Sequence, residues 1–233
     1  MNENNSDIND RPVRELSSPH VALALVLDVS CSMQEEVIGK RKIDLLNKAI
    51  NEMIKFAKND ERLFNIMDLG IFVFGDPNRN KVLQGFRAIR DCEEINLQAN
   101  DGSTYVAEAL NIAVDRLRER TMLYAEGGGG NAFVPWLVLI TDGEFHDNQA
   151  LEPIAERIKQ REREKKLHFF GFGVPGYDRN QLEKFSETPS DRVIDIDARN
   201  FTELFNRIGR SMAIISRATP GSDAELPTFK IGI

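Results

Sequence analysis

The chain has 233 residues, of which 41% are hydrophobic and 29% charged, and its formal net charge is −7. This length suits one large α/β domain that buries a core without disulfide bonds. The negative charge argues against a general nucleic-acid-binding protein, because phosphate contacts need clustered lysine and arginine side chains.

Residues 1–18 are polar and lack the apolar segment of a signal peptide, so we expect a flexible N-terminal tail. No apolar run approaches the roughly 18 residues of a membrane span. The two cysteines, Cys31 and Cys92, lack CxxC spacing, which argues against a disulfide framework or a cysteine-rich zinc site. We therefore expect a cytoplasmic protein with no nucleic-acid and no membrane partner.

Buried strands and amphipathic helices alternate between residues 19 and 217. The run HVALALVL at residues 20–27 is typical of a strand that is buried on both faces. The expected strands span residues 20–27, 68–74, 82–89, 135–141, 167–174 and 193–196. The expected helices span residues 40–57, 104–120, 151–165, 181–185 and 201–215.

The connection between the second and third strands is a turn at Asp76-Pro77-Asn78. Because this turn is too short for a parallel crossover, the third strand must be antiparallel and lie at the sheet edge. The element order predicts one α/β domain over residues 19–217, with an open, doubly wound, mostly parallel six-stranded sheet and one antiparallel edge strand. Residues 218–233 are interpreted as a C-terminal tail or an added edge segment.

Three polar segments follow the expected strands or open a helix. The first strand ends in Asp28-Val29-Ser30-Cys31-Ser32, and the strand at residues 135–141 ends in Asp142. Between them, the loop that contains Thr104 opens a helix. Ligands of open α/β sheets bind at the carboxyl ends of the strands, so we expect these side chains to converge.

Asp28, Ser30, Ser32, Thr104 and Asp142 offer only hard oxygen donors. Such donors suit Mg²⁺, and also Mn²⁺ or Ca²⁺, better than zinc. An ion held mainly by hydroxyls keeps much of its positive field and can attract a carboxylate from a partner protein. The alternative is that the serines and aspartates are ordinary caps of strand-to-helix turns.

The chain resembles a von Willebrand factor A domain with a metal-ion-dependent adhesion site. The resemblance covers about residues 19–217, with Asp28, Ser30 and Ser32 as the first motif, Thr104 as the second and Asp142 as the third. It implies that the hydroxyls bind the ion, that the aspartates contact it directly or through water, and that a ligand carboxylate completes the shell. It also implies that movement of the last helix, residues 201–215, could couple to occupancy of the metal site.

The segments ANDGSTYVAEAL and PWLVLITDGEFHD further resemble the bacterial cytoplasmic subgroup of tellurite-resistance and stress operons. Two departures from the family pattern concern the loops. Cys31 stands where the family often has glycine, and Ser103 precedes Thr104 where a second glycine is frequent. Ser103 or Asp101 could therefore support the metal ligands.

Other polar residues near the expected site have ordinary interpretations. Glu144 and Asp147 could orient bound waters, but helix-start or surface acids are the more common interpretation. His146 is near enough to be a stray metal ligand, but an oxygen site has no need for an imidazole. Cys31 could be redox-sensitive, although passive packing is the simpler interpretation. The glycine run at residues 127–130 lacks the spacing of a phosphate-binding loop, and we interpret it as a flexible loop.

Three functions remain open. The leading hypothesis is a non-catalytic adaptor that binds an acidic group of a partner protein through a divalent cation. A metal-dependent phosphohydrolase is the alternative, although no nucleophile–base pair is evident. A purely structural ion is the third possibility, and it would be enclosed by protein ligands.

Overall fold

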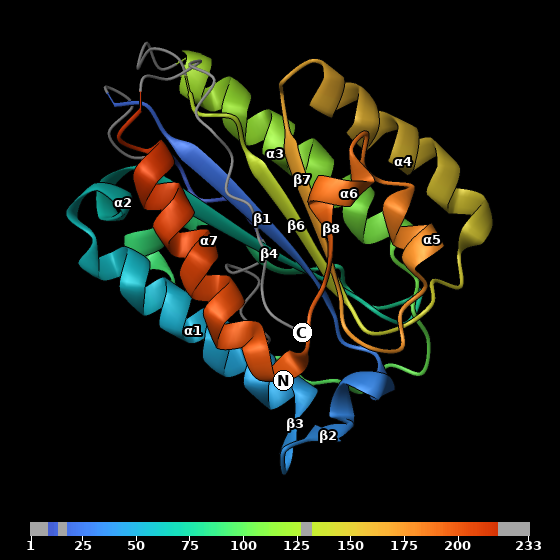
Figure 1. Ribbon diagram of the computed structural model, residues 1–233. Coiled ribbons are helices and arrows are strands. Elements are labelled where there is room, and N and C mark those ends of the chain that lie inside the picture. The colour runs from blue at the N-terminus through green and yellow to red at the C-terminus, as the bar shows by residue number, and fades with distance from the viewer. Residues whose placement is uncertain (1–8, 14–17, 127–131, 219–233) are drawn as a thin grey trace.

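Six strands form one sheet in the computed structural model, which describes residues 9–13, 18–126 and 132–218 (Figure 1). Their order across the sheet is β5-β4-β1-β6-β7-β8. The pairing is parallel throughout except between β4 and the edge strand β5. The predicted fold class is therefore confirmed. The strands are β1 (Val21–Asp28), β4 (Met67–Phe74), β5 (Val82–Ala88), β6 (Trp136–Thr141), β7 (His168–Gly173) and β8 (Val193–Asp195).

Helices cover both faces of this sheet (Figure 1). The longer ones are α1 (Lys42–Asn59), α3 (Ala107–Glu126), α4 (Asn148–Arg163) and α7 (Phe201–Ile215). The shorter ones are α2 (Glu61–Ile66), α5 (Arg179–Glu183) and α6 (Pro189–Arg192), with 3₁₀ turns η1 (Cys31–Gln34), η2 (Ile89–Asp91) and η3 (Ala198–Asn200). Within the described ranges, no helix has both the length and the apolar character needed to cross a membrane.

The central strand β1 separates two apolar cores. Its leucines pack in the cluster that includes α1 and α7, whereas Ala22, Ala24 and Val26 pack in the cluster with α3 and α4. Alternate side chains of a strand point to opposite faces, which produces this division. The β1 register pairs Asp28 with Phe74 and Leu27 with Ile140. Asp28 and Thr141 therefore end neighbouring strands at the same edge.

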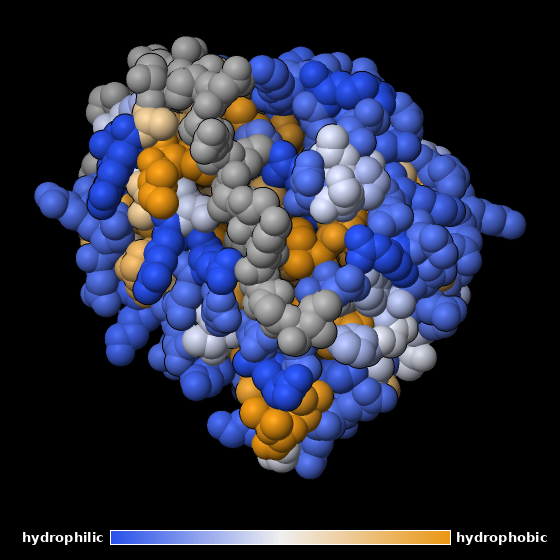
Figure 2. Space-filling model, in the orientation of Figure 1, coloured by the Kyte–Doolittle hydropathy of each residue, from blue (hydrophilic) through white to orange (hydrophobic). Residues whose placement is uncertain are grey.

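A short hairpin was not predicted and replaces the start of the expected helix at residues 40–57. Its strands are β2 (Glu36–Val37) and β3 (Lys40–Arg41). Its turn places Ile38 and Gly39 at φ angles of 51° and 72°. Ile38 is exposed, and Figure 2 shows apolar surface where the hairpin projects. The helix α1 therefore begins at Lys42.

Part of the predicted N-terminal tail lies along β5. The backbone N–H of Arg11 donates to the carbonyl of Phe86 at 2.7 Å, and the Phe86 N–H donates to Asp10 Oδ1 at 2.7 Å. A Cβ atom at Gly85 would lie 2.5 Å from the carbonyl carbon of Asn9, so this approach requires glycine. Residues 9–13 are thus joined to the domain. Residues 1–8, 14–17 and 219–233 of the predicted tails lie outside the described residues. The predicted flexible loop at Gly127–Gly130 also lies outside them.

Candidate metal centre

Asp28 ends β1 and is fully buried. Its Oδ1 accepts the Ser30 backbone N–H at 2.9 Å, and its Oδ2 accepts the Thr141 hydroxyl at 2.7 Å. The first bond ties Asp28 to the loop that follows β1, and the second ties Asp28 to β6. The carboxylate is therefore fixed by neutral donors.

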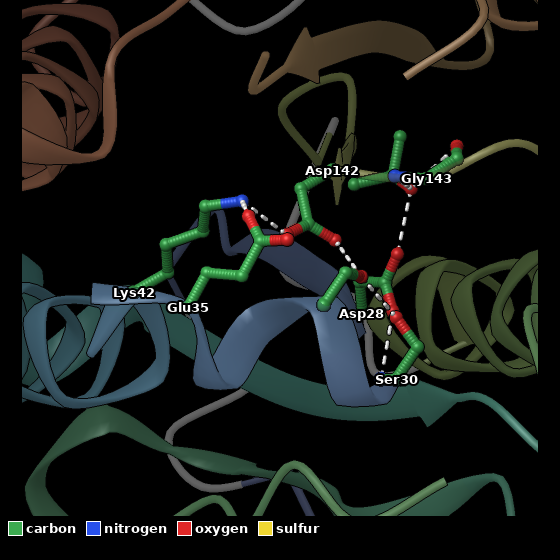
Figure 3. A network of polar contacts seen from close by, with 8 residues as sticks. Asp28, Ser30, Glu35, Lys42, Asp142 and Gly143 are labelled. Carbon is green, nitrogen blue, oxygen red and sulfur yellow. Dashed lines mark hydrogen bonds and ion pairs between the residues drawn. The ribbon is translucent and has the colours of Figure 1, made fainter. Parts of the chain in front are cut away.

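The hydroxyls of Ser30 and Ser32 point toward each other, with their Oγ atoms 2.9 Å apart. Ser32 also donates to Asp142 Oδ1 at 2.5 Å, which joins the loops after β1 and β6. The β1 loop is braced by Asp101, whose carbonyl accepts the Cys31 N–H at 2.7 Å. The structure thus brings four of the five predicted site residues into one network (Figure 3).

Thr104 faces the same network from a third loop. A Cβ atom at Gly143 would lie 3.4 Å from Thr104 Oγ1 and 4.0 Å from Ser32 Oγ. The Thr104 hydroxyl therefore lies close to Gly143, in the loop after β6. The backbone N–H of Thr104 donates to His146 Nδ1 at 2.9 Å, and the His146 N–H donates to the Thr104 carbonyl at 3.0 Å.

His146 thus positions the Thr104 loop in this structure, a role that was not predicted. The sequence offers one weak signal, because His146 follows Asp142 by four residues in the loop after β6. Its ring also lies against Tyr105, with ring centroids 5.9 Å apart. The contact of Nδ1 with a backbone N–H means that this nitrogen acts as an acceptor.

Lys42 is the second residue that sequence reasoning missed. Its Nζ donates to Asp142 Oδ2 at 2.8 Å and to Glu35 Oε2 at 2.6 Å (Figure 3). Lys42 is buried, whereas 66% of the Glu35 side chain is exposed. Nothing in the sequence indicated this contact, since a lysine at the start of an amphipathic helix is usually placed in solvent.

The surroundings of Asp28 and Lys42 affect the pKa values of the two side chains in different ways. Burial raises the pKa of Asp28 to about 6; hydrogen bonding to Ser30 opposes the shift and the charge of Asp142 adds to it. Burial by itself would lower the pKa of Lys42, but the hydrogen bonds and charges of Asp142 and Glu35 raise it above its usual value. The Asp28 carboxylate therefore favours a proton or another cation, while Lys42 stays charged.

The neighbouring polar residues serve mainly to connect loops. Asp101 Oδ1 accepts a hydrogen bond from Arg79 Nη1 at 2.7 Å, and Asp101 Oδ2 accepts the Asp76 backbone N–H at 3.0 Å. Ser103 Oγ donates to Asp76 Oδ1 at 2.5 Å. Both side chains hold the loop after β4. Whether either supports a bound ion stays a prediction.

Asp147 caps a helix to which it does not belong, because its Oδ2 accepts the N–H of Ala107 at the start of α3 at 2.7 Å. This contact agrees with the interpretation of Asp147 as a helix-start acid. Glu144 is exposed. Cys31 is exposed and free, and its backbone avoids the positive φ that would call for glycine.

The donor set fits a hard divalent cation. Two carboxylates and three hydroxyls are oxygen donors of the kind that Mg²⁺, Mn²⁺ and Ca²⁺ prefer. No group of three or more histidine, cysteine, aspartate or glutamate side chains in the described part of the chain is suited to hold a metal. A metal at this edge would therefore depend on the hydroxyls of Ser30, Ser32 and Thr104.

Comparison with solved structures identifies several similar domains. A proximal thread matrix protein 1 structure from the mussel byssus, described with a zinc-occupied MIDAS motif, aligns with 84% of this chain and 48% of its own at 16% identity and a TM-score of 0.52. The pilus adhesin SpaC from Lactobacillus rhamnosus GG aligns with 84% of this chain and 31% of its own, at 15% identity and a TM-score of 0.59.

A von Willebrand factor type A protein from Catenulispora acidiphila aligns with 83% of this chain and 42% of its own, at 14% identity and a TM-score of 0.55. The chain spans less than half the length of each of these three proteins, and identities this low establish only the fold. No curated protein matches the sequence. The model of the von Willebrand factor type A domain matches residues 23–144, just over half of the chain, so the chain belongs to this family.

Proposed function

We propose that the chain is a protein-binding module that grips an acidic group of a partner protein through a divalent cation, with Mg²⁺ as the expected ion. Ser30, Ser32 and Thr104 would hold the ion through their hydroxyls, and Asp28 and Asp142 would bind it directly or through water. The bound ion would supply positive charge to a partner carboxylate. The protein's own residues fix the donors at the carboxyl ends of the strands, where Ser32 is partly exposed and the other four donor residues are buried.

One observation carries this proposal. Ser32 links both loops, because its Oγ lies 2.9 Å from Ser30 Oγ and 2.5 Å from Asp142 Oδ1. Oxygen atoms from segments 110 residues apart in sequence thus meet at one point. Simple turn caps would each bond to their own local backbone and would not need this convergence.

The relatives support the same type of function. One of them is described with a zinc-occupied MIDAS motif and another as a pilus adhesin. We propose a cytoplasmic setting in a bacterial stress-response or tellurite-resistance system, on the basis of the segments at residues 99–110 and 135–147.

We propose that the chain is not an enzyme. The hydroxyls that could act as nucleophiles, those of Ser30 and Ser32, are bonded to each other and to Asp142. The nearby imidazole of His146 uses Nδ1 to accept the Thr104 N–H. A Mg²⁺-dependent turnover of p-nitrophenyl phosphate that disappears in Asp28→Ala would overturn this part of the proposal.

An affinity pull-down tests the binding function. The wild type and the Asp28→Ala/Ser30→Ala variant are incubated with native lysate in Mg²⁺ and in EDTA. We expect a partner that only the wild type retains, and only in Mg²⁺. Equal retention in all conditions would remove the interaction from this site.

A further inference from the structure

Lys42 occupies a position that is unfavourable for a cation on two counts. It is the first residue of the 18-residue helix α1, where the helix dipole favours negative rather than positive charge. Its residue exposure is only 4%, so its ammonium group has lost most of its hydration. Helix stability therefore does not account for a lysine here.

The contacts of Lys42 point to the metal site instead. Nζ lies 2.8 Å from Asp142 Oδ2, and the other oxygen of Asp142 accepts the Ser32 hydroxyl at 2.5 Å. The Asp142 carboxylate thus lies between the Lys42 ammonium group and the serine hydroxyls, as Figure 3 shows. Asp28 has no such partner among the described residues, since the hydrogen bonds to its carboxylate come from Ser30 and Thr141.

We propose that Lys42 sets the charge of the metal centre, so that the centre binds its cation less tightly and an external carboxylate more tightly. Two ionised aspartates alone would neutralise a divalent ion. Lys42 adds one positive charge next to Asp142, and the buried groups together with the ion then carry a net charge of +1. Glu35 counteracts Lys42 only in part, because its side chain is 66% exposed and its charge is screened by solvent.

This inference rests on the proposed function and adds a determinant of partner chemistry to it. A lysine that merely braced Asp142 would support both binding steps, so its loss would weaken both. A lysine that sets the charge has opposite effects on the two steps. The sign of the two changes therefore separates the charge-setting role from the bracing role.

The test uses the full chain at pH 8 with Mn²⁺ as the ion and acetate as the carboxylate. Calorimetry gives the Mn²⁺ dissociation constant, and the paramagnetic broadening of the [¹³C]acetate carboxyl signal by the Mn²⁺-loaded protein reports acetate binding. Lys42→Met removes the charge but keeps an unbranched side chain, and Lys42→Arg keeps the charge. Glu35→Gln removes the exposed acid and should act in the opposite direction, even if Lys42→Met fails to fold.

We expect Lys42→Met to tighten Mn²⁺ binding by about three- to tenfold and to weaken acetate binding by a similar factor. Lys42→Arg should stay within about twofold of the wild type. Glu35→Gln should weaken Mn²⁺ binding and strengthen acetate binding, each by about twofold.

Two results would overturn the inference in distinguishable ways. If the wild type binds Mn²⁺ and broadens acetate but the variants change both affinities in the same direction, or change neither, Lys42 does not set the charge and the proposed function stands. If the wild type binds no Mn²⁺, or binds it without broadening acetate, the metal-bridged function fails and the role of Lys42 fails with it.

Discussion

Two buried carboxylates, those of Asp68 and Asp28, lie at opposite ends of the sheet and have different hydrogen-bond partners. At the amino end of β4, Asp68 Oδ2 accepts Arg120 Nε at 2.8 Å and the Tyr124 hydroxyl at 2.5 Å. Asp68 and Arg120 are each 1% exposed. At the carboxyl end of β1, Asp28 meets only neutral donors among the described residues.

This difference distinguishes Asp68, which belongs to a structural ion pair, from Asp28, which is available to bind a cation. Asp68 has its countercharge within the fold, so no further ion is required. Asp28 has no countercharge among the described residues, and burial raises its pKa to about 6, so its ionised form is less favoured in the fold than in water. A divalent cation would provide the missing charge. Four substitutions test this comparison.

The largest effect is expected from Arg120→Met at the Asp68 end. Removing the guanidinium leaves a buried carboxylate without its partner, and we expect a loss of about 3–5 kcal/mol in the free energy of unfolding. Urea denaturation measures the loss. The control Arg207→Met breaks an exposed pair with Glu203 and should cost less than about 1 kcal/mol. Equal losses in the two variants would remove the special status of the Asp68 cluster.

At the other end, Asp28→Asn should stabilise the metal-free protein. The pKa of Asp28 is raised from 3.8 to about 6, so the folded protein binds more protons than the unfolded chain between these pH values. Stability therefore falls as pH rises through this window, and the full cost is present at pH 7. We expect Asp28→Asn in EDTA at pH 7 to gain about 1–3 kcal/mol.

The same variant should lose Mn²⁺ binding, because the carboxylate is a proposed ligand. Denaturation in EDTA at pH 4, 5, 6 and 7 provides the check. The stability difference between the variant and the wild type should grow with pH. A variant that is less stable than the wild type at pH 7 would show that the fold compensates the Asp28 charge without an ion.

A smaller effect is expected from Tyr124→Phe. It removes one donor to Asp68 but leaves Arg120, so we expect a cost of about 1–2 kcal/mol in unfolding free energy and unchanged Mn²⁺ affinity. Tyr105→Phe, near the metal site, serves as the comparison variant. A change in Mn²⁺ affinity caused by Tyr124→Phe would mean that the two ends of the sheet are coupled.

The smallest effect is expected from His146→Phe, which keeps an aromatic ring against Tyr105 but loses the acceptor for the Thr104 N–H. We expect Mn²⁺ affinity to fall by about tenfold or less, as is typical when a partner that positions a metal ligand is lost. Calorimetry measures this change. Glu144→Gln, an exposed acid in the same loop, should change the affinity less than twofold; an equal loss in both would point to a general charge effect.

The sheet and most of the site could be predicted because each depends on local patterns. The apolar runs that end at Asp28 and before Asp142 indicated two strands, and the strand-end rule then placed their polar residues at one edge. The antiparallel position of β5 followed from a turn too short for a crossover. The structure brings Thr104 to the same edge, as the helix-opening loop suggested.

The unpredicted features depend on contacts between distant segments. Lys42 reaches Asp142 across 100 residues of sequence, and its helical position alone favours solvent. Residues 9–13 bind β5 through the Arg11 backbone N–H and the Asp10 carboxylate, and neither contact leaves a trace in hydrophobic periodicity. The hairpin at residues 36–41 depends on the unusual backbone of Ile38, and Ile disfavours a positive φ angle.

The most direct test of the metal-bridged site is anomalous diffraction from crystals grown with Mn²⁺ and acetate. We expect one anomalous peak among Ser30, Ser32 and Thr104, with an acetate or water oxygen in at least one coordination position of the ion. An ion surrounded by six protein oxygens, or no ion at this edge of the sheet, would contradict it.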